Sequence, residues 1–186
     1  MLIGTALLVC ILSVPLMGGR LSGLTELGFR HAWLPVAALA AQVLIISVLP
    51  GGGGHLSEEI HLATYALLGV FLVFNRHIPG LLVVAAGGAL NFAAIAASGG
   101  VMPADPEAIA AAGIPQDATE FANSAPADGA PLGFLGDVFH TPGWLPIHNV
   151  FSVGDLVIVL GAFMLLHRAC GTPLGRLPGR LRPAEA

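Results

Sequence analysis

Five long apolar stretches divide the chain, and glycine, proline or charged residues separate them. Within each stretch the apolar residues continue on every side of a helix and do not alternate as they would in a half-buried strand, which is typical of helices that meet no water. Most of the stretches fall near the lower limit of the roughly 17–25 residues that cross a bilayer, and a flanking turn would extend them. The pattern predicts helices over residues 2–17, 32–49, 60–74, 81–97 and 153–167.

The positive charges follow the same division. The chain contains seven basic residues, and all of them are arginines placed after the first, third and fifth stretches: Arg20, Arg30, Arg76, Arg168, Arg176, Arg180 and Arg182. Positive charge on one side of consecutive spans is the pattern of a multi-pass membrane protein. We therefore expect an all-α integral membrane bundle of five transmembrane helices, with the N-terminus outside and the C-terminus inside.

Composition favours the same class. Charged residues make up 10% of the chain, whereas soluble domains carry about 25%. The net charge is −4 and no uniformly basic face exists, so a nucleic-acid partner is not expected. Only Cys10 and Cys170 are present, which does not indicate a disulfide framework. Because the N-terminus has no basic region and no evident cleavage site, we interpret it as a retained first span.

The chain is expected to form one transmembrane domain, residues 1–167, followed by an arginine- and proline-rich cytoplasmic tail, residues 168–186. A long outer segment, residues 98–152, joins the fourth and fifth helices. Within it, Asp105 followed by Pro106 predicts the start of a short helix, and residues 116–131 have no periodicity. Ser57 is expected to cap the third helix.

The fifth helix carries a clear start signal. Ser152 stands three residues before Asp155, the arrangement of a capping box in which each side chain binds the backbone of the other. Asp155 is then placed in the first turn of this helix, near the outer segment.

Candidate chemistry gathers near the outer face. Asn91 lies in the middle of an apolar helix and needs a hydrogen-bonding partner; a structural bond, for which Gln42 is a candidate, is favoured over a role in holding a ligand. His61 lies one turn before Tyr65, and Asp137 and Asp155 could reach the same place. The candidate ligand or proton site therefore consists of His61, Tyr65, Asn91, Asp137 and Asp155.

Metal binding and catalysis are less favoured. The outer face holds His55, Glu58, Glu59, His140 and His148 besides the candidate site, but their spacing matches no metal motif. Capping and ordinary loop polarity explain these residues, so no metal and no cofactor is expected, and no catalytic residue is assigned.

Small residues recur at every fourth position of the fourth helix: Ala85, Ala89, Ala93 and Ala97. Such a face allows close helix approach in lipid. The expected partners are therefore the lipid bilayer and, through this face, other membrane-protein subunits or a second copy of the chain.

The chain also resembles a known family. The elements that carry the resemblance are His61–Tyr65, Asn75-Arg76, Asn91 ahead of Gly99-Gly100-Val101-Met102-Pro103, Leu135–Val138, and Ser152-Val153-Gly154-Asp155. They are similar to those of an uncharacterised family of small bacterial multi-pass membrane proteins, a domain of unknown function. The resemblance implies a location in the bacterial plasma (inner) membrane and implies no activity.

Two kinds of function remain open at this point. The favoured one is a non-catalytic subunit, an assembly factor, or a binder of an apolar or lipid-like ligand, because the mid-helix polar groups are amides and not charges. The alternative is a small transporter or membrane enzyme that uses the outer histidine and aspartate residues.

Overall fold

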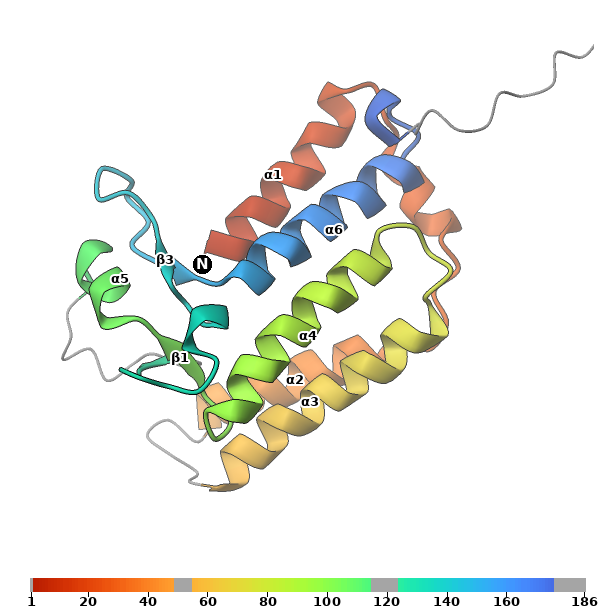
Figure 1. Cartoon of the computed structure of the whole chain (residues 1–186). Coiled ribbons are helices and arrows are strands. Elements are labelled where there is room, and N and C mark those ends of the chain that lie inside the picture. The colour runs from red at the N-terminus through yellow and green to blue at the C-terminus, as the bar shows by residue number, and fades with distance from the viewer. Residues whose placement is uncertain (1, 49–54, 115–123, 176–186) are drawn as a thin grey trace, which may run out of the picture.

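The computed structural model describes residues 2–48, 55–114 and 124–175; the side chains of residues 45–48, 55–58 and 61 lie outside the described part. Five long helices form the body of the molecule, and short strands and turns gather at one end of it (Figure 1). The long helices are α1 (Leu2–Leu16), α2 (Trp33–Val48), α3 (His55–Phe74), α4 (Leu81–Ala97) and α6 (Val153–Ala169).

The helices begin and end close to the apolar stretches, with one clear exception. Helix α3 begins at His55, five residues before the apolar stretch, so Ser57 lies inside the helix and the prediction that it caps the helix is wrong. The capping box of α6 is present as predicted, with Ser152 as the N-cap. Asp105 also caps its helix, α5 (Pro106–Ala111), by accepting a hydrogen bond from the backbone of Glu107.

The prediction of five membrane spans is wrong. Within the described residues, no helix combines the length and the apolar character needed to cross a membrane. Helices α1, α2, α4 and α6 have 15, 16, 17 and 17 residues. At about 1.5 Å per residue they measure about 23–26 Å, whereas the hydrocarbon core of a bilayer is about 30 Å thick.

Helix α3 is longer, at 20 residues, but its first two turns contain serine, two glutamates and histidine. Its apolar part is therefore no longer than the other helices. The expected location, a multi-pass protein of the bacterial plasma membrane, depended on the spans and is contradicted by the same finding.

The all-α prediction is also wrong for the segment between α4 and α6, which contains short strands. Strand β1 (Met102–Ala104) pairs in parallel with β2 (Ser124–Pro126), and β3 (Phe139–His140) pairs antiparallel with β4 (Val150–Phe151). Two short 3₁₀ turns, η1 (Leu21–Glu26) and η2 (Gly133–Leu135), precede α2 and β3, and a third, η3 (Pro173–Gly175), follows α6. Since β2 falls in a stretch without periodicity, its pairing with β1 could not be predicted locally.

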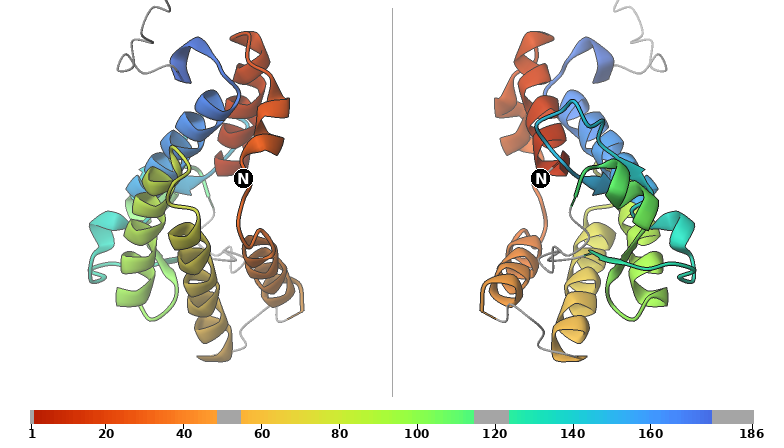
Figure 2. Two further views of the ribbon diagram at one scale, coloured as in Figure 1. Left: turned by 90° about the vertical axis from the view of Figure 1, so that its right-hand side faces the viewer. Right: turned by 90° about the vertical axis from the view of Figure 1, so that its left-hand side faces the viewer.

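The long helices pack in the order α1, α6, α4, α3, α2, each against its neighbour. Figure 2 shows α1 beside α6, with α2 and α3 on the other side of α4. The arginine-bearing connections meet at one end of this arrangement. There the backbone of Arg20 donates to Cys170 O, and Asn75 exchanges two hydrogen bonds with the backbone of Arg30.

The fully buried imidazole of His167 links α6 to α1 at the same end. His167 is 1% exposed, and its Nε2 lies 3.0 Å from the Ser13 hydroxyl. Ser13 donates its own proton to Cys10 O, so its oxygen is free to accept from the imidazole. On the other side, His167 Nδ1 lies 2.8 Å from the hydroxyl of Thr172, which follows the helix.

Candidate functional site

Helices α4 and α6 cross at glycine residues, and this crossing positions the site. A Cβ atom added at Gly87 would lie 2.5 Å from Gly154 O, and one added at Gly161 would lie 2.5 Å from Val84 N. Only glycine permits backbones to approach this closely. One turn after Gly87, the side chain of Asn91 therefore lies directly against the first turn of α6.

Asn91 is held by two residues of that first turn. Its Nδ2 donates to Asp155 Oδ1 over 2.8 Å, and its Oδ1 accepts from the Ser152 hydroxyl over 2.8 Å. The prediction that Gln42 is the partner of Asn91 is wrong, because Gln42 instead donates to the Thr64 hydroxyl and links α2 to α3. Asn91 is 7% exposed, so its polar atoms need these partners.

The capping box fixes the Asp155 carboxylate in turn. Its Oδ2 accepts from Ser152 N over 3.1 Å, while the Ser152 hydroxyl accepts from Asp155 N over 3.0 Å. Each carboxylate oxygen of Asp155 thus accepts one hydrogen bond, and each has a further lone pair for another donor. The start of α6 carries a carboxylate of fixed orientation.

Asp137 reaches the same region from the segment that follows η2. Its backbone forms a bridge to β1, since Asp137 N donates to Pro103 O and its carbonyl accepts from Asp105 N. Its carboxylate accepts from the Ser124 hydroxyl over 2.7 Å through Oδ2. Thus β1 and β2 together hold an acid that is only 6% exposed.

Burial changes the acidity of this group. Loss of water raises the pKa of the Asp137 carboxyl to about 6; the hydrogen bond from Ser124 opposes that rise, and the negative charge of Asp155 adds to it. The two carboxylates are therefore close enough to influence each other.

Tyr65 completes the group from α3. Its ring packs against Phe92, with ring centroids 5.6 Å apart, and against the buried cluster formed by Ala94, Ile95 and Met102. Burial, followed by the negative charges of Asp155 and Asp137, raises the pKa of Tyr65 to about 12. The phenol therefore stays protonated at neutral pH and can donate a hydrogen bond.

These side chains line one end of a large cavity. The cavity has a volume of about 1430 Å³ and lies mainly among α2, α3 and α4. It is larger than most ligand sites, which commonly measure about 300–1,000 Å³. Its walls are mostly leucine, valine, alanine and phenylalanine, and its polar lining residues are Gln42, Tyr65, Arg76, Asn91, Ser124, Asp137, Asn149 and Asp155.

The structure brings four of the five candidate residues to this cavity: Tyr65, Asn91, Asp137 and Asp155. Their role in binding stays a prediction. The fifth, His61, lies in α3, but its side chain is outside the described residues, as are those of His55 and Glu58. The cavity also contains Ser124, which sequence reasoning missed because nothing local marks a parallel strand pair.

The remaining acids and histidines of the outer face lie elsewhere. Glu59 is exposed, and neither His140 nor His148 lines the cavity. The imidazoles of His140 and His148 contact the carbonyl oxygens of Thr141 and Ala112. Among the described side chains, no three of histidine, cysteine, aspartate or glutamate are grouped to hold a metal ion.

The alanine face of α4 has a different setting from the one expected. Ala85 and Ala89 line the cavity, while the close contact of α4 with α6 is made through glycines. A partner surface formed by Ala85, Ala89, Ala93 and Ala97 stays a prediction.

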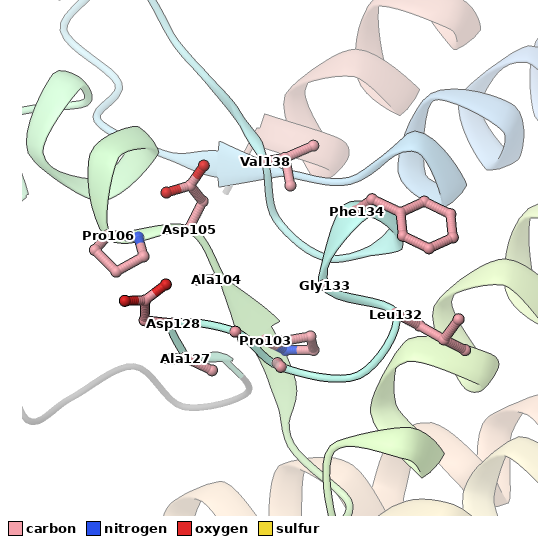
Figure 3. A pocket seen from close by; sticks show the side chains of 12 residues that line it. Pro103, Ala104, Asp105, Pro106, Ala127, Asp128, Leu132, Gly133, Phe134 and Val138 are labelled. Atoms are coloured by element: carbon pink, nitrogen blue, oxygen red, sulfur yellow. The ribbon is translucent and has the colours of Figure 1, made fainter.

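A second, smaller hollow of about 410 Å³ lies in the segment between α4 and α6. Figure 3 shows it between Pro103–Pro106, the turn at Ala127 and Asp128, and Leu132–Phe134. Its two carboxylates differ in setting: Asp105 already caps α5, and Asp128 is exposed. Small and cyclic side chains form most of its walls, so it offers fewer groups for recognition than the large cavity.

The fold and the site together define a small helical bundle with a partly open apolar cavity, one end of which is acidic and hydrogen-bonded. Residues 26–167 match the model of DUF5317, described as a family of unknown function, and the chain belongs to this family. The resemblance to a family without known function is thus confirmed at that level. Comparisons with curated proteins and with solved structures gave no match.

Proposed function

We propose that the chain binds an amphipathic small molecule. The apolar part of the ligand occupies the cavity among α2, α3 and α4, and its polar part meets Tyr65, Asn91, Asp137 and Asp155. The observation that carries this proposal is the cavity of about 1430 Å³, which is apolar along most of its walls and has grouped polar side chains at one end. A mostly apolar pocket with a few converging polar groups is the usual form of a small-molecule site.

Binding is favoured over catalysis by the way the polar groups are used. Asn91 and Asp155 bind each other and the start of α6, so both have a structural task as well as a place in the cavity wall. Such pre-organised groups orient a ligand without needing to move. We therefore assign no catalytic residue.

Filling the cavity tests the proposal. Gly88 lines it, and a Cβ atom at this position would meet nothing within 4 Å. Gly88→Leu should weaken binding of the neutral apolar dye Nile red by about tenfold or more, because the new side chain occupies ligand volume. Fluorescence titration of the wild type and the variant with Nile red measures the two affinities.

Gly4→Leu provides the matched control. Gly4 is also a helical glycine with open space around its Cβ position, but it does not line the cavity. Its Nile red affinity should equal that of the wild type. Failure of the wild type to bind the dye, or equal loss in both variants, would overturn the proposal.

A further inference from the structure

The polar end of the cavity contains more acceptors than donors. Asp137 and Asp155 contribute two carboxylates. The Ser124 hydroxyl donates its single proton to Asp137, and Asn91 donates one amide proton to Asp155. A ligand that supplies several donors would satisfy this end better than one that supplies acceptors.

The basic residue that lines the described cavity is Arg76, and it lies near the other end. It follows α3, whereas Tyr65 lies eleven residues earlier, roughly 16 Å away at the helical rise per residue. Arg76 therefore cannot pair with Asp137 or Asp155. The two carboxylates face the cavity without a cation from the described residues.

Asp137 itself has an unused oxygen. The residue is only 6% exposed, and its Oδ2 accepts a hydrogen bond from the Ser124 hydroxyl. No described group donates a hydrogen bond to its Oδ1. Among the described residues, this oxygen is not one of the fully buried polar atoms that lack a partner, so it stays accessible from the cavity that Asp137 lines, and a donor from a ligand can reach it.

We propose that the polar group of the ligand is a protonated primary amine, carried on an apolar chain and placed between Asp137 and Asp155. This inference rests on the proposed function above and specifies its ligand class. An ammonium group has three donors, of which one reaches Asp137 Oδ1 and another a remaining lone pair of Asp155. A fatty carboxylate would instead place a third negative charge beside the two aspartates.

A metal ion fits this end less well. Among the described residues, this end offers two carboxylates and no third histidine, cysteine, aspartate or glutamate grouped with them. An organic cation needs only hydrogen bonds and charge, and its chain is stabilised by the apolar walls.

The test compares three probes that share the dodecyl carbon skeleton and differ in their head group: dodecylamine, dodecanol and dodecanoate. Equilibrium dialysis at about pH 8 keeps the amine protonated and Asp137 ionised. We expect dodecylamine to bind about tenfold more tightly than dodecanol, and dodecanoate to bind most weakly. An alcohol that binds as tightly as the amine overturns the amine assignment and leaves the proposed function in place, whereas failure of all three probes and of Nile red overturns the proposed function.

A pair of variants locates the head group. Asp137→Asn should reduce the preference for dodecylamine over dodecanol to nearly one. Asp128→Asn makes the same change in net charge at an exposed acid outside the large cavity, and it should keep the full preference. Equal loss of preference in both variants would show a general charge effect and would overturn the proposed position of the amine.

Discussion

Asn91 Nδ2 lies 2.8 Å from Asp155 Oδ1, and this hydrogen bond joins the middle of α4 to the first turn of α6. The same amide accepts from Ser152, the N-cap of α6, so one side chain contacts both members of the capping box. Because Asp155 also lines the cavity, the bond connects the stability of the helix pair to the geometry of the site.

The Asn91–Asp155 bond should be measurable as a coupling energy. Asn91→Ala should destabilise the protein by about 2–3 kcal/mol, because the buried Ser152 hydroxyl loses its acceptor and Asp155 Oδ1 loses its donor. In an Asp155→Ala background the same change should cost about 1–2 kcal/mol less, since the partner is already absent. Urea unfolding of the two single variants and the double variant gives the coupling directly.

Additive free energies in that cycle would contradict the bond. Asp155→Ala should itself cost about 1 kcal/mol or more through loss of the cap, so the cycle, and not either single variant, isolates the contact.

Two adjacent glycines of α4 should respond in opposite directions to the same substitution. Gly87→Ala should destabilise by about 2 kcal/mol or more, because its Cβ would lie 2.5 Å from Gly154 O on α6 and the helices would have to separate. Gly88→Ala should stabilise by about 0.5–1 kcal/mol, because its Cβ meets open space and alanine favours the helix. Thermal unfolding of both variants checks the pair, and a shift of the same sign in both would show that α4 and α6 do not cross at Gly87.

Much of the helical framework could be predicted from local signals. Helix α4 occupies the predicted stretch, Leu81–Ala97, because glycine precedes it and polar and glycine residues follow it. The start of α6 was predictable because Ser152 and Asp155 are three residues apart, and a capping box depends on nothing further away. Composition and arginine placement, however, suggested membrane spans that the lengths of the helices do not support.

The parts that could not be predicted depend on contacts between distant residues. Nothing near Asn91 indicates that its partner is Asp155 and not Gln42, since the choice depends on how closely Gly87 and Gly154 let two helices approach. Ser124 likewise reaches Asp137 only because β2 pairs with β1. Pairing of this kind is set by the packed fold and not by the local sequence.

The buried His167 should contribute strongly to the contact between α1 and α6. His167→Leu should destabilise by about 2–4 kcal/mol, because it removes two hydrogen bonds within a buried site between Ser13 and Thr172. His140→Leu is the matched control: that imidazole is exposed, so its loss should change stability by less than about 0.5 kcal/mol. Chemical unfolding distinguishes them, and equal effects would contradict the structural role of His167.

The buried carboxyl of Asp137 should make stability depend on pH in a defined direction. Its pKa in the folded protein is about 6, above the ordinary value of 3.8, so the folded state binds this proton more tightly than the unfolded chain does. The stability contributed by the protonated form is fully present below about pH 4 and is lost as the pH rises through 6. The ionised group then costs up to about 3 kcal/mol, at about 1.4 kcal/mol per pKa unit.

Asp137→Asn should therefore stabilise the protein at high pH and change little at low pH. Asparagine can still accept from Ser124 but carries no charge to bury, so the variant should exceed the wild type by up to about 3 kcal/mol at about pH 8 and nearly equal it at about pH 4. Urea unfolding at both values measures the difference. Since Asp128 is exposed, Asp128→Asn should show no such change between the two pH values. A constant difference between Asp137→Asn and the wild type across this range would mean that Asp137 does not titrate in the folded protein as its burial requires.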